Sequence, residues 1–138
     1  MSKEKSKITL IKEFIEKCPL LNGGKVNVDY IKDKIDSYSI DETPATTILQ
    51  KFADGGSRRQ INFDFSIQAP FSVLENINNS KFCDDFMKWI EEQDNNCHYP
   101  EINGVEKISC NRGTILQTTE TTAIYVIPMQ LIYIEEAL

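Results

Sequence analysis

Apolar and polar residues alternate strictly along Arg58–Ala69, which reads RRQINFDFSIQA. The apolar residues of this stretch occupy every second position: Ile61, Phe63, Phe65 and Ile67. A period of two places these side chains on one face of a β-strand and the polar side chains between them on the other. A DGGS turn sequence precedes the stretch, and Pro70 follows it. The pattern therefore predicts a long antiparallel strand, with one face packed on a core and the other available to solvent or to a partner.

Five further stretches have the residue pattern of strands. They are Ser37–Asp41, Thr46–Phe52, Val105–Asn111, Thr114–Thr118 and Thr122–Glu135. Thr46–Phe52 is rich in β-favouring residues, and its Ile48, Gln50 and Phe52 share a face. Because only a short turn separates this stretch from Arg58–Ala69, the two are expected to form an antiparallel hairpin.

The stretch Thr122–Glu135 is apolar on both faces of the strand that it predicts. One face holds Tyr125, Ile127, Met129, Leu131 and Tyr133, and the other holds Ile124, Val126, Ile132 and Ile134. Such a strand is either central in a covered sheet or buried in an oligomer interface. Pro128 lacks a backbone donor, which predicts a bulge or an edge segment at that point.

The N-terminal part of the chain predicts a helix over Ser2–Pro19. Apolar residues recur there at spacings of three and four, with lysines and glutamates opposite, and Pro19 ends the helix. Leu20–Gly24 is a turn. Lys25–Tyr30 fits either a short strand or the lead into a short helix that ends near Ile35, and the pattern does not decide between them.

A second helix is expected over Phe71–Gln93, where the apolar residues again follow helical spacing. The segment 78–80 (NNS) is compatible with a break into two pieces, with Ser80 capping the second. The apolar stripe contains Phe82, Phe86 and Trp89, the single tryptophan of the chain. We expect this stripe to cover the Phe63/Phe65 face of the strand.

The order of the predicted elements is helix, strands, helix, strands. Successive strands with short turns pair antiparallel, so the sequence predicts an α+β fold. The expected architecture is a mostly antiparallel sheet with an N-terminal helix and a long central helix packed on it. A length of 138 residues is that of a single domain, here spanning residues 1–138.

The chain is acidic, with a formal net charge of −6 at pH 7. This balance argues against broad binding of a nucleic-acid backbone, which needs a basic face. Lysines gather in the first 25 residues, whereas acidic residues cluster at 29–42 and at 84–94. These clusters are either solvated surfaces or a pair of complementary docking surfaces. The charged N-terminus argues against a signal peptide and against a membrane-spanning helix.

Candidate chemistry is sparse. The four cysteines are far apart without metal-ligand spacing, so free thiols are expected. The single histidine, His98, follows Cys97, but neighbouring side chains seldom form a productive nucleophile and base. The glycine-rich loop before Arg58 lacks the order of a phosphate loop and joins two strands. It is either an ordinary hairpin turn or a loop that projects Arg58 and Arg59 to a neighbouring subunit or a nucleic-acid channel. We expect no catalytic, metal-binding or cofactor-binding residues and no enzyme.

Several motifs, taken in order and spacing, resemble one family. They are CPL at 18–20, DGGS at 54–57 with RQ at 59–60, FDF at 63–65, NINNSKF at 76–82, Phe86 with WIEEQ at 89–93, Pro100, and LIY at 131–133. The chain resembles a small minor capsid protein of phages and prophages of low-GC Gram-positive bacteria, over about Pro19–Tyr133. Proteins of this kind are similar to tail terminators, also called tail completion proteins.

The resemblance implies a structural protein of a virion or phage-tail-like particle. A tail terminator has an α+β fold and forms a hexameric ring on the tail tube, where it ends tube polymerisation and presents a surface to the head connector. The implied partners are copies of this chain, the tail tube protein, and sheath, collar or connector proteins. DNA only passes through the lumen, and no membrane is involved. The implied location is the bacterial cytoplasm during assembly and then the head-proximal end of the tail.

Two surfaces are expected to meet a neighbouring subunit or the tube. One is the polar side of the Arg58–Ala69 strand, and the other is a contact between the lysine-rich first helix and the acidic second helix of a neighbour. The residues of these two hypotheses are Arg58, Arg59, Asp64 and Gln68 for the strand, and Lys12, Lys17, Asp84 and Asp85 for the charged contact. Two alternative functions remain open, another head–tail connector or stopper component and a small binding module of a host cell.

Overall fold

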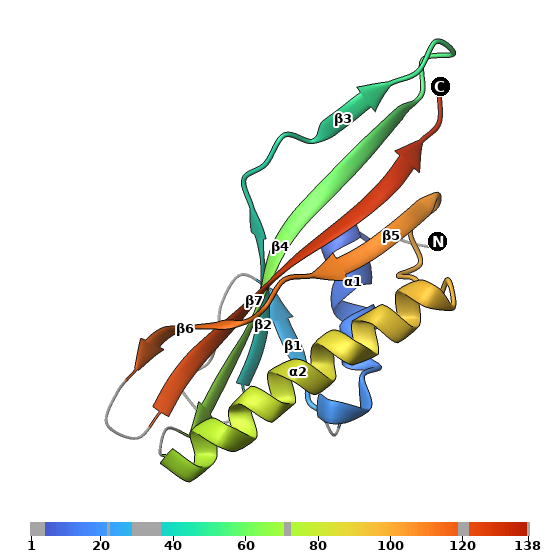
Figure 1. The fold of residues 1–138 in the computed structure, drawn as a ribbon. Helices are drawn as coiled ribbons and strands as arrows, with labels where there is room; N and C mark the ends of the chain where they lie inside the picture. Colours follow the sequence, from blue (N-terminus) through green and yellow to red (C-terminus); the bar gives the residue numbers. More distant parts are fainter. Residues whose placement is uncertain (1–4, 22, 29–36, 71–72, 119–121, 138) are drawn as a thin grey trace.

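The structure is a computed structural model and describes residues 5–21, 23–28, 37–70, 73–118 and 122–137 (Figure 1). Its elements are α1 (Lys7–Glu16), η1 (Pro19–Leu21), β1 (Val26–Val28), β2 (Ser37–Thr43), β3 (Ile48–Lys51), β4 (Ser57–Pro70), α2 (Val73–Asn95), β5 (Val105–Cys110), β6 (Thr114–Thr118) and β7 (Thr122–Glu135). In these residues the chain has an α+β fold with one mostly antiparallel sheet, as the sequence predicts.

The two longest strands, β4 and β7, form the centre of the sheet. They pair antiparallel without a register shift from Ser57↔Glu135 to Pro70↔Thr122. The other edge of β4 is shared by β2 and β3, and the other edge of β7 is shared by β5 and β6. Strand β1 extends the sheet by parallel pairing with β2. Figure 1 shows β4 and β7 running side by side along the molecule, with the β3–β4 hairpin projecting beyond the helices.

The hydrophobic core lies on the face of the sheet that holds the odd-numbered residues of β4 and β7. Phe63, Phe65, Ile127 and Leu131 are fully buried there. Phe86 of α2 stacks on Phe65, with ring centroids 4.7 Å apart. The predicted cover of the Phe63/Phe65 face by the central helix is therefore confirmed.

Helix α1 packs beside α2 on the same side of the sheet. The Ser6 hydroxyl caps α1, and Phe14 lies against Trp89 of α2 with ring centroids 5.3 Å apart. The backbone N–H of Val26 donates to Glu16 Oε2 at 2.9 Å, which ties the end of α1 to β1. The first helix is thus fixed both to the second helix and to the edge of the sheet.

Several predicted elements differ from the structure in their bounds or continuity; β3, for example, is Ile48–Lys51 rather than Thr46–Phe52. Helix α1 begins at Lys7 rather than Ser2, after its cap; residues 1–4 lie outside the described part. Helix α2 is continuous through residues 78–80, so the weak helix propensity of asparagine and serine does not break it there. The ambiguous segment forms a strand at Val26–Val28, whereas its remainder, 29–36, falls outside the described residues.

Pro128 does not produce a bulge in β7. The pairing of β7 with β4 continues through Asp64↔Pro128 without a shift. The Pro128 carbonyl accepts a hydrogen bond from the Asn111 N–H at 2.8 Å, so the backbone polar groups of Pro128 face away from β4. On that side β5 ends at Cys110 and β6 begins at Thr114. The missing donor therefore lies where one edge strand gives way to the next, which matches the edge alternative of the prediction.

Candidate functional site

The second face of the sheet carries polar residues from β4 beside mostly apolar residues from β7. The cross-strand pairs on this face are Arg58↔Ile134, Gln60↔Ile132, Asn62↔Gln130, Asp64↔Pro128, Ser66↔Val126 and Gln68↔Ile124. The aliphatic side chains of β7 in these pairs are partly exposed. Ring contacts place both described helices on the opposite face, against Phe65 and Tyr133. The central strand β7 is therefore covered by helices on one side only, as far as the described residues extend.

Polar contacts cross the second face at the hairpin end. Arg58 bonds to Gln50 of β3, and its Nε lies 2.8 Å from Glu106 Oε1 on the opposite edge of the sheet. The Arg58 guanidinium also lies over the Phe52 ring, 5.6 Å from its centroid. The hydrogen bond from Arg58 lowers the pKa of Glu106. These contacts hold β3 and β5 on either side of the two central strands.

A second row of polar contacts lies next to the row formed by Gln50, Arg58 and Glu106. Gln130 Nε2 donates to Gln60 Oε1 at 2.6 Å, and Gln60 Nε2 donates to the Thr46 carbonyl at 2.6 Å. Both glutamines are thus held across the β3, β4 and β7 region. These hydrogen bonds fix the side-chain amides of Gln60 and Gln130. Ile132 of β7, the cross-strand partner of Gln60, contributes apolar surface between the two rows of polar contacts.

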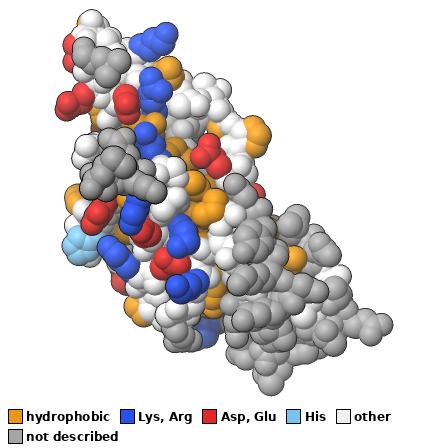
Figure 2. Space-filling model, turned by 180° about the vertical axis from the view of Figure 1, so that it is seen from behind, with side chains coloured by type: hydrophobic (Ala, Val, Ile, Leu, Met, Phe, Trp, Pro, Cys, Tyr) orange, Lys and Arg blue, Asp and Glu red, His pale blue; other side chains and the backbone are white. Residues whose placement is uncertain are grey.

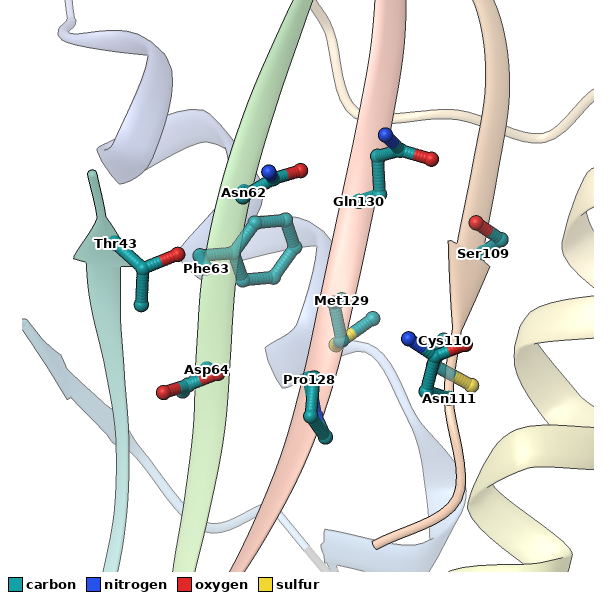
Figure 3. A pocket seen from close by; sticks show the side chains of 10 residues that line it. All are labelled: Thr43, Asn62, Phe63, Asp64, Ser109, Cys110, Asn111, Pro128, Met129 and Gln130. Carbon is teal, nitrogen blue, oxygen red and sulfur yellow. The ribbon is translucent and has the colours of Figure 1, made fainter. Parts of the chain in front are cut away.

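A depression of about 290 Å³ lies beyond these contacts, across β2, β4, β7 and β5. Figure 3 shows its lining residues: Thr43, Asn62, Phe63, Asp64, Ser109, Cys110, Asn111, Pro128, Met129 and Gln130. Phe63 and Met129 are buried on the core face, so they line the depression with backbone. The polar lining has one carboxylate, Asp64.

Comparisons of the chain with known proteins identify no family. No family model matches the chain, and no curated protein matches its sequence. Within the described residues, no group of three or more His, Cys, Asp and Glu side chains is placed to hold a metal ion. A search of the same residues finds no helix with the length and apolar character needed to cross a membrane.

The four residues expected to form a contact surface on the strand, Arg58, Arg59, Asp64 and Gln68, do not share one exposed face. Arg58 and Arg59 belong to β4 itself rather than to the preceding loop, and they point to opposite faces. Arg59 Nε donates to Ser57 Oγ at 2.9 Å. Asp64 lines the open depression, but Gln68 is only 6% exposed. The expectation that Gln68 belongs to an accessible surface is therefore wrong, whereas Arg58 and Asp64 both lie on the second face, at separate points along β4.

The charged residues of the other hypothesis are largely paired within the chain. Lys12 bonds to Glu16 at 3.2 Å, and Lys81 bonds to Asp85 at 2.8 Å. Asp84 lies 3.7 Å from Arg112. Lys17 is exposed beside a surface depression at the end of α1. Figure 2 shows acidic and basic side chains interspersed on the face that it views, rather than gathered by sign. Exposed pairs of this kind are weak, so a contact with a neighbour remains a prediction.

The loop that contains the single histidine has a structural role. The Tyr99 hydroxyl lies 3.0 Å from Asp94 Oδ1, and the same oxygen accepts a hydrogen bond from the Ile108 N–H at 3.1 Å. Burial and the bond to Asp94 raise the pKa of Tyr99 to about 12. Cys97 adopts φ +56°, the left-handed conformation that commonly ends a helix. The loop therefore fastens the end of α2 to β5.

All four cysteines are free. Burial raises the pKa of Cys18 and Cys83, and it raises that of Cys110 to about 11. High values keep these thiols protonated and unreactive at neutral pH. The expectation of free thiols is confirmed.

The exposure of two apolar residues was not predicted from the sequence. Leu49 of β3 and Ile115 of β6 are each 46% exposed, and they are the large apolar side chains classed as exposed in the described part of the chain. A register shift lies next to each of them, between Ile48 and Gln50 and between Ile115 and Gln117. Strict alternation assigns such residues to one face or the other. An irregular edge strand breaks that rule, and the sequence carries no clear sign of the irregularity.

Proposed function

We propose that this chain is a structural subunit of a phage tail or phage-like particle, and that it acts as a tail terminator. In this proposal copies of the chain form a hexameric ring at the head-proximal end of the tail tube. The ring ends tube polymerisation and presents its other side to the connector or collar. The motif pattern between Pro19 and Tyr133 motivates the choice of this family.

One structural observation carries the proposal, the two-sided apolar character of β7. Its odd-numbered residues fill the core, while Ile124, Val126, Ile132 and Ile134 are only partly buried on the second face. Apolar surface that folding leaves partly exposed is typical of proteins that bury it on assembly. A ring subunit needs such a surface for its contacts with neighbouring copies.

The edges of the sheet support the same proposal. Strands β3 and β6 lie at opposite edges and have no further partner strand in the described residues. Unpaired edges are normally blunted, and exposed aliphatic residues on them favour association. The net charge of −6 also suits a conduit, since an acidic lumen repels the DNA backbone and lets the nucleic acid slide.

The test uses a tail tube protein from the same genome, whose gene the proposal expects close to the gene of this chain. Tube protein is allowed to polymerise alone and with the purified chain, and tube lengths are measured by negative-stain electron microscopy. We expect shorter tubes that carry a ring at one end, in proportion to the amount of chain added. Tubes of unchanged length without a ring at either end contradict the proposal. Binding to the connector without binding to the tube assigns the chain instead to a connector or stopper component.

A further inference from the structure

The two exposed apolar residues lie at diagonally opposite corners of the sheet. Leu49 is on β3, which pairs with β4 at residues 57–59. Ile115 is on β6, which pairs with the far end of β7 at Ala123–Val126. Figure 1 shows β3 and β6 at opposite ends of the two long strands, and the strand pairing places them on opposite edges, β3 beside β4 and β6 beside β7. Two different patches on opposite edges are what a head-to-tail contact between identical subunits requires.

A depression beside β6 offers a receptor for an apolar side chain. It has a volume of about 200 Å³ and lies between the first half of α2 and β6. Its lining consists of Ser80, Cys83, Asp84, Arg112, Gly113, Ile115 and Tyr125. A protein cavity of 150 Å³ accepts a molecule as large as benzene, so the space accommodates a leucine side chain. Ile115, Cys83 and Tyr125 contribute the apolar part of the lining, and Asp84 and Arg112 contribute charged groups.

We propose that β3 of one copy pairs with β6 of the next copy, and that Leu49 occupies the depression beside Ile115. The proposal rests on the ring-forming function and names the surfaces that build the ring. The occupant is a second copy of this chain, because the same molecule presents both the projecting leucine and the depression that receives it.

Strand direction favours this pairing. Strand β3 is antiparallel to β4, β4 is antiparallel to β7, and β7 is antiparallel to β6. Within one copy β3 and β6 therefore run in opposite directions. Two copies that continue one sheet in the same orientation bring β3 and β6 together as an antiparallel pair. Such pairing satisfies the outward backbone groups of each edge, which have no partner strand among the described residues.

Charges at the two corners are also compatible. Lys51 follows Leu49 by two residues and is exposed, whereas Asp84 lies at the rim of the depression with its side chain 57% exposed. Arg112 lies 3.7 Å from Asp84 at the same rim. In the proposed contact Lys51 approaches Asp84 from the neighbouring copy. Rim charges of this kind add orientation and association rate more than affinity.

The diagonal placement constrains the assembly. Because β3 and β6 lie at opposite ends of the central strands, successive copies are offset along the strand direction. A ring closes with this offset only if the strands are inclined to the ring axis, as they are in a barrel. Without that inclination the same contact builds an open helical filament. Whether the assembly is a closed ring or an open filament therefore tests the ring function independently of the β3–β6 contact.

The experiment uses the full chain and two complementary variants, Leu49→Asp and Ile115→Asp. Each removes one half of the contact, at a position exposed enough to leave the fold intact. We expect each variant alone to sediment as a monomer, with the dissociation constant raised at least about tenfold, the effect of a central interface residue. An equimolar mixture should sediment as a dimer, because each variant retains the half that the other has lost.

Two further variants serve as controls. Leu10→Asp, on α1, makes the same change away from both edges and should assemble like the unmodified chain. Ser80→Arg fills the depression from the exposed side of α2 without altering β6, and it replaces Ile115→Asp in the mixing experiment if that variant does not fold. Circular dichroism and urea unfolding check the fold of every variant.

The outcomes distinguish this contact from the proposed function. A closed oligomer lost in both variants and a dimer in their mixture support the contact. An open filament with the same sensitivity supports the contact but overturns the ring function. Variants that assemble like the unmodified chain, a mixture that stays monomeric, or an unmodified chain that stays monomeric at its highest soluble concentration overturn the contact. Rings formed by both variants overturn the contact and leave the ring function standing.

Discussion

The two faces of the β4–β7 sheet use the same strands for different purposes. On the core face Phe65 is fully buried between Tyr38 and Phe86. On the second face Ile132, one residue from the fully buried Leu131, is only partly buried beside Gln60. The difference shows that folding uses the apolar residues of one face and leaves those of the other available. The following predictions test that contrast, beginning with the largest expected effect.

Truncation on the core face should be the most costly change. Phe65→Ala removes a ring that is fully buried and stacks at 4.7 Å on Phe86. We expect the free energy of unfolding to fall by about 3–5 kcal/mol, from lost burial and the cavity that remains. Urea unfolding followed by circular dichroism measures the change. A loss below about 1 kcal/mol means that the aromatic stack does not support the fold.

A buried position on the second face should respond like the core. Gln68→Lys places a charge where the side chain is 6% exposed, and we expect a loss of at least about 2 kcal/mol. Asp64→Lys is the matched control, because Asp64 lies on the same row of β4 but lines the open depression. Its unfolding free energy should change by no more than about 0.5 kcal/mol. Equal effects at both positions contradict the distinction between them.

Substitutions at two adjacent residues of β7, one on each face, should change the free energy of unfolding by different amounts. Leu131→Thr introduces a hydroxyl into the core, and we expect a loss above about 2 kcal/mol. Ile132→Thr, on the partly exposed face, should cost less than about 1 kcal/mol in the unassembled chain. Thermal or urea unfolding at low protein concentration provides both values. If Ile132→Thr costs as much as Leu131→Thr, the second face is as buried as the first.

The smallest effect is expected at the exposed ion pair of the hairpin end. The hydrogen bond from Arg58 lowers the pKa of Glu106. Since the folded-state pKa is depressed, this contribution is present above the pKa of the unfolded chain and is lost as pH falls through the folded value. In Arg58→Gln the pKa of Glu106 should rise towards its ordinary value. An NMR titration of the carboxyl group compares the two proteins, and an unchanged pKa excludes the pair in solution.

Regular alternation made the core face predictable. The period of two at Ile61–Ile67 identifies the buried side, and helical spacing around Phe86 identifies its partner. Both signals come from burial of one face, which repeats along the chain and therefore appears in the sequence. The hairpin of β3 with β4 follows from the turn residues alone.

The second face was less predictable, because its burial depends on tertiary contacts rather than on period. Gln68 and Asp64 occupy equivalent positions in the alternation, yet one is buried and the other lines a depression. The exposure of Leu49 follows from an irregular strand pairing, and no single residue type in the sequence predicts that irregularity. Sequence reasoning therefore found Arg58 and Asp64 as surface residues but missed the corners of the sheet.

The central claim is that assembly uses the open side and the edges of the sheet. The most direct test is amide hydrogen exchange of the chain in its assembled form and at a dilution where it is monomeric. We predict slower exchange on assembly in β3 (Ile48–Lys51) and β6 (Thr114–Thr118), with little change in α1 (Lys7–Glu16), which lies away from both edge strands. Slower exchange confined to α1 and α2, with unchanged exchange in both edge strands, would contradict the claim.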